Sequence, residues 1–175
     1  MFNKGDTVLY GSSGVCRVEG TKQQELYDIT MEYLVLKPVY DENSTVFVPV
    51  RNKELMSKII PILSEKQVYE FIDNIPNEET IWIEDDKQRK QLYQDIISRF
   101  DRKQLVQIIK TLYLHKISQQ EKGRKLHQCD EQILRQAEKL LYSEFAVALN
   151  IPVDEILPLI TKQIELSKTK TPDCS

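Results

Sequence analysis

Long apolar segments are missing from this 175-residue sequence, and no run approaches the ~18 residues that a membrane-spanning helix needs. Residues 1–6 turn polar at once and lack the hydrophobic region of a secretory signal. Cysteine is also scarce: Cys16, Cys129 and Cys174 lie far apart and form no Cys-x-x-Cys pair. This usage predicts free thiols in a reducing cytoplasm and argues against a zinc site.

Histidine is limited to His115 and His127, and neither belongs to a Ser-His-Asp, Cys-His or metal-ligand pattern. A phosphate-binding loop is missing as well. The sequence therefore predicts a protein that is not an enzyme and that binds no cofactor, metal or small-molecule substrate. An uncharacterised enzyme stays open as an alternative, and a deep pocket lined by a perturbed acid or base would favour it.

The first sixty residues contain short runs of β-branched and aromatic residues separated by turn residues. The runs are residues 6–10, 15–19, 31–40 and 45–50, and Gly20 is expected to close the second one. Short strands at close spacing are typical of a small antiparallel barrel. We therefore assign residues 1–60 to a β-barrel domain.

Beyond residue 63 the apolar spacing becomes that of amphipathic helices. Ser64 and Gln67 form a capping-box pattern at the first helix. Further helices are predicted over residues 84–99, after Asp101, over residues 128–149 and after Pro152, with a loop at 118–126. Pro158 is expected to kink or split the last helix. This predicts a compact all-α domain of about five helices over residues 64–166, followed by a frayed polar tail at 167–175.

Positive charge is concentrated in the middle of the chain. Residues 82–125 contain eleven Lys or Arg and six Asp or Glu, a net charge of +5, whereas the whole sequence carries −3. One interpretation is that these charges only keep the exposed faces of helices solvated. The other is a nucleic-acid surface that the average charge conceals.

The two halves carry motifs that occur together in one known family. In the first half they are residues 4–10 (KGDTVLY), 32–37 (EYLVLK) and 46–49 (VFVP). In the second half they are residues 99–101 (RFD), 106–112 (VQIIKTL) and 134–144 (LRQAEKLLYSE). Over about residues 3–150 the sequence thereby resembles the CarD/CdnL family of bacterial transcription regulators. Its first part also resembles the RNA-polymerase-interacting domain of transcription-repair coupling factor.

The resemblance implies an α+β fold, with an N-terminal Tudor-like (SH3-like) small β-barrel followed by a compact helical domain. It also implies a cytoplasmic regulator that binds the RNA polymerase β-subunit lobe through the barrel. The helical domain would contact the minor groove of promoter DNA, with weak sequence specificity, and stabilise the open complex. The alternative is a protein-only interaction module whose helical domain binds another protein, and the acidic residues 84–86 favour it.

The expected polymerase contact is an edge strand formed by Thr45, Val46, Phe47, Val48 and Pro49. An exposed edge can extend a partner's sheet through main-chain hydrogen bonds, and Pro49 would end that ladder. By alternation, Val46 and Val48 fill the barrel core, whereas Thr45 and Phe47 face outward.

The DNA contacts implied by the resemblance are Trp82, Lys87, Arg89, Lys90, Arg124 and Lys125. The five cations would bind phosphates weakly and independently of sequence. Trp82, the only tryptophan, would insert beside a base step as an apolar wedge. Because it lies between two isoleucines, Trp82 also fits a buried core residue, and both interpretations stay open.

Overall fold

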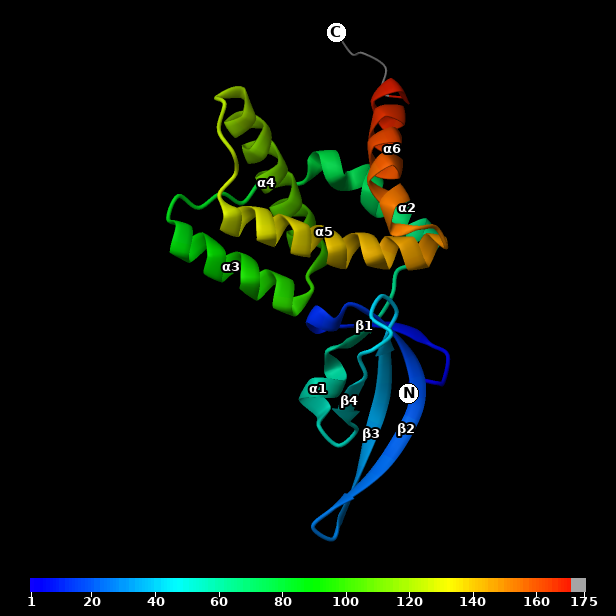
Figure 1. Cartoon of the computed structure of the whole chain (residues 1–175). Coiled ribbons are helices and arrows are strands. Elements are labelled where there is room, and N and C mark those ends of the chain that lie inside the picture. Colours follow the sequence, from blue (N-terminus) through cyan, green and yellow to red (C-terminus); the bar gives the residue numbers. More distant parts are fainter. Residues whose placement is uncertain (171–175) are drawn as a thin grey trace. The chain divides into compact units, whose positions relative to one another are not determined.

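The computed structural model describes residues 1–170, with side chains as far as residue 163. The chain divides into two compact units, Met1–Ile62 and Leu63–Ser175 (Figure 1). Of the predicted tail, residues 171–175 lie outside the described residues, and residues 167–170 belong to the last helix.

The first unit is an antiparallel sheet of five strands in the order β4-β3-β2-β1-β5. The strands are β1 (Thr7–Tyr10), β2 (Val15–Leu26), β3 (Ile29–Pro38), β4 (Val46–Pro49) and β5 (Ile59–Pro61). A 3-10 turn, η1 (Gly11–Ser13), and a short helix, α1 (Lys53–Ser57), complete the unit. The predicted α+β class, a small barrel-like sheet module followed by helices, is confirmed.

Alternating residues of the strands build the core of this unit. The buried set is Val8, Cys16, Val18, Leu34, Leu36, Val48 and Ile59. On β4, Val48 is fully buried and Val46 packs against the core, whereas Thr45 and Phe47 are exposed. The predicted alternation along this strand is therefore confirmed.

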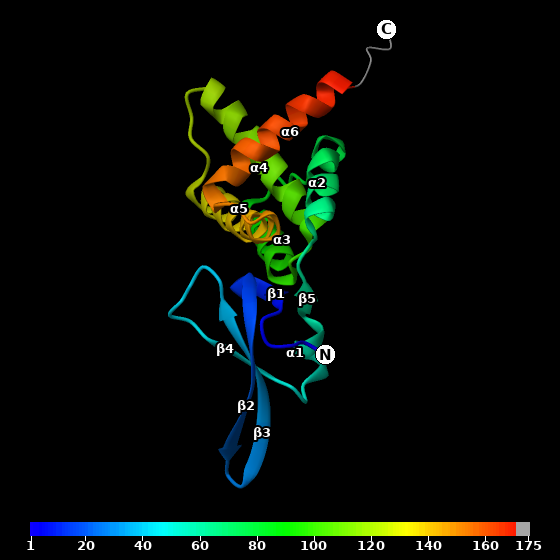
Figure 2. The same cartoon turned by 90° about the vertical axis from the view of Figure 1, so that its right-hand side faces the viewer.

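The β2–β3 hairpin is longer than the sequence predicted. We expected the strand to end at Gly20, but β2 continues to Leu26 through a bulge between Val18 and Gly20. At the tip, Tyr27 and Asp28 adopt φ values of 49° and 62°, as a two-residue hairpin turn requires. Residues 21–30 are all exposed and extend beyond the rest of the sheet (Figures 1 and 2). Polar residues fill this stretch because it faces no core, which is why the alternation that marks a half-buried strand is missing.

Helices make up the second unit. They are α2 (Glu65–Asn74), α3 (Asp86–Arg99), α4 (Arg102–Glu121), α5 (Gln128–Leu149) and α6 (Ile156–Lys170), with 3-10 turns η2 (Ile75–Asn77) and η3 (Val153–Glu155). The capping box at Ser64 and the N-cap at Asp101 form as predicted. Residues from α2, α4, α5 and α6 share one core, where Phe71 meets Phe145 edge-on with ring centroids 5.8 Å apart.

Two helix predictions were wrong. Residues 118–121, expected in a loop, continue α4 as far as Glu121. Pro158 neither kinks nor splits the last helix, because α6 begins at Ile156 and places the proline in its first turn. Backbone N–H groups in a first turn have no intrahelical acceptor, so proline loses no hydrogen bond there.

Candidate functional site

Arg89, on α3, lies at the centre of the basic segment but is only 2 % exposed. Nε and Nη2 donate to the two carboxylate oxygens of Asp130 on α5, at 3.1 and 2.7 Å. Nη2 also donates to Asp86, at 2.7 Å. Nη1 donates to the backbone carbonyls of Ile83 and Glu84, at 2.7 and 3.4 Å. A guanidinium has five N–H groups, so these contacts use all of them.

This geometry changes one predicted contact. With its donors engaged inside the protein, Arg89 has none left for a phosphate, although its side chain lines the open groove described below. The sequence could not separate Arg89 from Lys87 and Lys90, which are exposed. Its main partner, Asp130, is 41 residues away in the chain.

Trp82 is half-buried, so it is neither a sealed core residue nor a free side chain. Its ring stacks on His115 of α4 with centroids 4.0 Å apart and an interplanar angle of 26°. The guanidinium carbon of Arg89 lies 4.3 Å from the ring centroid, within cation–π range. The indole N–H donates to the Glu84 carboxylate at 3.0 Å.

The backbone of Ile81, the residue before Trp82, is hydrogen-bonded to two helices, α3 and α4. The Ile81 N–H donates to the Thr111 hydroxyl at 2.8 Å, and the Tyr93 hydroxyl donates to the Ile81 carbonyl. Burial raises the pKa of Tyr93 to about 12, so the phenol keeps its proton and remains a donor at neutral pH. The Trp82 segment is therefore positioned by α3 and α4 together.

Acidic side chains surround the start of α3. Asp85 caps the helix by accepting from the Gln88 N–H at 2.8 Å. The hydrogen bond and the charge of Arg89 hold the pKa of Asp86 below its usual value, with a smaller contribution from His127. Asp86 is thus a full negative charge beside the two exposed lysines of this helix.

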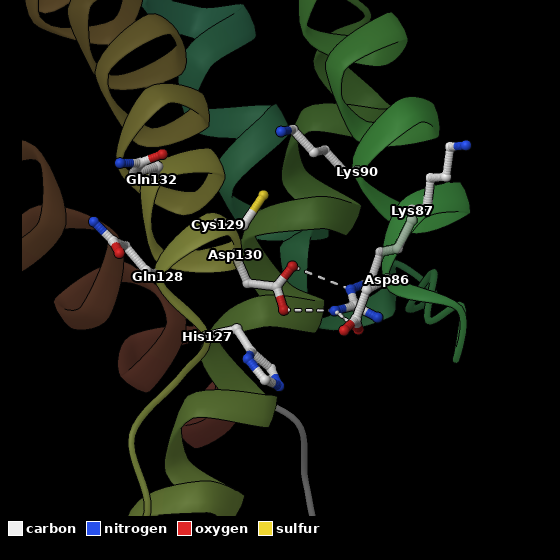
Figure 3. Close-up of a pocket in the computed structure, with 9 residues that line it drawn as sticks. Asp86, Lys87, Lys90, His127, Gln128, Cys129, Asp130 and Gln132 are labelled. Atoms are coloured by element: carbon white, nitrogen blue, oxygen red, sulfur yellow. Dashed lines mark hydrogen bonds and ion pairs between the residues drawn. The ribbon is translucent and has the colours of Figure 1, made fainter.

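An open groove of about 730 Å³ separates the starts of α3 and α5. Lys87 and Lys90 line it from α3, and His127, Gln128 and Gln132 line it from the α5 side (Figure 3). The Arg89–Asp130 pair also lines the groove. Both helices begin at the same side of the unit (Figure 1), so the groove brings residues 86–90 next to residues 127–132, which lie far away in the sequence.

Arg124 and Lys125 occupy the segment that leads from α4 into α5, and both are exposed. Leu126, next along the chain, is buried, and His127 is the N-cap residue of α5. The structure thus leaves four of the five predicted cations at the surface, two on α3 and two just before α5.

The sheet unit presents its own candidate surface. β4 is an edge strand, and Phe47 is 48 % exposed. Its ring meets Tyr33 edge-on with centroids 6.4 Å apart, and the Lys22 ammonium lies 5.9 Å from its centroid. The hairpin tip adds three exposed apolar residues: Leu26, Tyr27 and Ile29.

Within the described part of the chain, no three His, Cys, Asp or Glu side chains gather as a metal site requires. No helix in that part is both long enough and apolar enough to cross a membrane.

The two units match the two parts of one known family. A model of the CarD-like/TRCF RID domain matches residues 2–60. A model of the CarD C-terminal domain matches residues 67–161, more than half of the chain. The chain belongs to the CarD family. A comparison of this CarD family protein with individual curated proteins found no match.

Membership confirms the resemblance seen in the motifs and fixes the broad function. This CarD family protein is transcription-associated and interacts with RNA polymerase, in a family of non-enzymatic transcription factors. Sequence reasoning missed the hairpin tip, although Leu26, Tyr27 and Ile29 are conspicuous apolar residues in a polar stretch. Nothing in the sequence pointed to Asp130 or His115 as partners of the Trp82 segment.

Proposed function

We propose that this CarD family protein acts in the cytoplasm, where it binds the β-subunit lobe of RNA polymerase through its sheet unit. Its helical unit binds promoter DNA and stabilises the open complex, without chemistry. The main support is the occurrence of both family domains in order, over residues 2–60 and 67–161. A coupling of about 1–3 kcal/mol between the two binding events would suffice.

The proposed polymerase surface is the edge strand of residues 45–49. An edge strand has unpaired main-chain groups and can extend a partner's sheet. The half-exposed ring of Phe47 supplies an apolar side-chain contact. We add the hairpin tip to this surface, because a cluster of exposed apolar side chains is typical of protein–protein contacts.

The proposed DNA surface consists of Lys87, Lys90, Arg124, Lys125 and the exposed part of Trp82. Exposed cations can neutralise phosphates without reading the sequence. Insertion of Trp82 into the minor groove as a wedge would require its ring to leave the stack on His115.

Polymerase docking is tested with the full chain and a purified β-lobe fragment. Phe47→Asp should weaken binding at least tenfold, because it places a charge in an apolar contact. Ser12→Asp makes the same charge change at an exposed residue that follows β1, and should bind like the wild type. Failure of the wild-type chain to bind the lobe at micromolar concentration would remove the docking proposal.

DNA binding is tested by titrating a forked promoter duplex at several salt concentrations. Removing both Lys87 and Lys90, as glutamines, should lower the salt slope by roughly 1.4–1.8, because each phosphate contact contributes about 0.7–0.9. A Lys103→Gln/Lys139→Gln variant removes the same charge from other exposed positions and serves as the control. In transcription assays, Trp82→Ala should shorten the open-complex lifetime, and an unchanged lifetime would exclude a wedge.

The second candidate function is a protein-only module whose helical unit binds another protein. The exposed acids Glu84, Asp85 and Asp86 favour it, because they stand beside the lysines and repel phosphate. This candidate predicts that DNA binding is absent even at low ionic strength. The same titration of the forked duplex therefore separates the two functions.

A further inference from the structure

We infer that Arg89 is a positioning residue for the proposed DNA surface. It joins the Trp82 segment, the start of α3 and the start of α5, so that the two pairs of exposed cations keep a fixed spacing. The inference rests on the proposed function, because it assigns a role at the proposed DNA surface to a residue that cannot touch DNA.

Three separate segments converge on the guanidinium of Arg89. The loop before α3 contributes the carbonyls of Ile83 and Glu84, α3 contributes Asp86, and α5 contributes Asp130. The loop carbonyls accept from Nη1, Asp130 accepts from Nε and Nη2, and Asp86 accepts from Nη2, all within a planar fork whose geometry is rigid. A shift of any one segment would break at least one contact to the other two.

The charges of Arg89 and its partners also depend on one another. Arg89 and Asp130 are buried together, with 2 % and 3 % of their side chains exposed. Removing the arginine would strand the Asp130 carboxylate in the interior, a costly arrangement that protonation of Asp130 or a shift of α5 toward water would relieve. It would also leave Asp86 unneutralised beside Glu84 and Asp85, and so make the groove less favourable to phosphate.

The contacts of Arg89 lie close in the sequence to both pairs of exposed cations. Lys87 and Lys90 flank Arg89 on α3, and Lys125 immediately precedes buried Leu126 at the entrance to α5. The dashed contacts in Figure 3 reach Asp130, in the first turn of the helix that follows Arg124 and Lys125, within the groove that Lys87 and Lys90 line. The contact between Arg89 and Asp130 thereby joins the helix that carries Lys87 and Lys90 to the helix that Lys125 leads into.

A buried ion pair that only stabilises the unit would not connect the two pairs of exposed cations. The same unit contains such a pair, which serves as a control. Arg102 and Glu144 pair at 2.7 Å, with 20 % and 0 % of their side chains exposed. Arg102→Gln removes one buried-pair cation, as Arg89→Gln does, but leaves the groove untouched. The two variants are to be compared with the wild type, in the full chain, at a temperature where circular dichroism shows each to be folded.

The first readout is the fluorescence of Trp82, the only tryptophan. Arg89→Gln should shift its emission to the red and increase quenching by acrylamide, because the cation over the ring and the anchors at Ile83 and Glu84 are lost. Arg102→Gln should leave both properties unchanged. Arg89→Lys keeps the charge but not the fork, and should restore only part of the wild-type emission.

The second readout is the salt slope of binding to the forked duplex. Arg89→Gln should lower the slope by about one unit, the equivalent of one phosphate contact, although Arg89 makes none. If Arg89→Gln does not fold, Asp130→Asn replaces it, because the amide oxygen still accepts one of the two hydrogen bonds.

A wild-type slope and emission for the folded Arg89 variant would overturn the inference, as would an equal loss of slope in Arg102→Gln. Failure of the proposed function has a different signature. In that case the wild-type chain itself shows no salt-dependent binding, and the inference falls with it, whatever Trp82 reports.

Discussion

Glu144 provides the sharpest test of how the helical unit is held together. This α5 residue is 0 % exposed. Its Oε1 accepts from the Leu63 N–H at 2.9 Å and from Arg102 Nη2 at 2.7 Å, and its Oε2 accepts from Arg102 Nε at 2.9 Å. Glu144→Ala would thus remove the acceptor of the first backbone N–H of the unit and the partner of a mostly buried cation.

The expected cost follows from these contacts. Breaking a buried ion pair by removing one partner costs about 3–5 kcal/mol. Arg102 is 20 % exposed, so water can reach part of it, which lowers that share to about 2–3 kcal/mol. The unpaired Leu63 N–H adds about 1 kcal/mol. We therefore expect a loss of about 3–4 kcal/mol, which lowers Tm by roughly 12–16 °C at about 4 °C per kcal/mol.

Urea unfolding of the full chain, followed by Trp82 fluorescence, measures this loss. Trp82 belongs to the helical unit, so its signal reports that unit even if the sheet unit unfolds at a different urea concentration. Glu144→Gln retains an oxygen acceptor for Leu63 and should cost less than Glu144→Ala. An Arg102→Met/Glu144→Leu variant should recover most of the stability, because it leaves no buried charge.

A loss below 1 kcal/mol for Glu144→Ala would refute the reasoning, since the carboxylate would then be replaceable by water. Strict additivity of Arg102→Met and Glu144→Leu, each also measured alone, would refute it as well. Residues in direct contact within one buried pair should show a measurable interaction energy.

Two further predictions concern titration. Cys16 is fully buried, and burial raises its pKa to about 11. Native protein treated with iodoacetamide at pH 8 should therefore yield an unlabelled Cys16 peptide and a labelled Cys129 peptide. Equal labelling of the two peptides would contradict this. The pKa of Asp86 lies below its ordinary value of 3.8 through the hydrogen bond and charge of Arg89. A carboxyl whose pKa is lower in the folded protein stabilises the fold at pH values above its pKa in the unfolded chain. This stabilisation is lost as the pH falls through the pKa of the folded protein. Urea midpoints should therefore show wild type more stable than Asp86→Asn at pH 7 and the two converging below about pH 4; a gap independent of pH would contradict the assignment.

Elements with a core-facing pattern could be predicted from the sequence. The bounds of α5, Gln128–Leu149, coincide with the predicted range, because its buried residues recur at helical spacing. The capping box at Ser64 identified the start of α2 through a local hydrogen-bond pattern. In contrast, α1 and β5 have five and three residues, too short for periodicity to register.

The candidate site was predictable only as far as local chemistry extends. The positive charge of residues 82–125 and the edge position of Thr45–Pro49 follow from composition and alternation. The burial of Arg89 does not, because it depends on Asp130 in another helix. Trp82 matched two interpretations because the residues that hold it half-exposed, His115 and Arg89, come from two different helices.

In the hairpin arm of residues 21–30, the side chains and the fold depend on different interactions. Each of its side chains faces solvent, and its register is maintained by main-chain pairing from Thr21 opposite Leu34 to Leu26 opposite Ile29. Substitutions there remove no core packing, so they change the side chains that the arm presents to solvent at little cost in folding free energy. If the arm takes part in the proposed polymerase contact, its side chains can therefore change to suit a different partner while the buried strands stay unchanged.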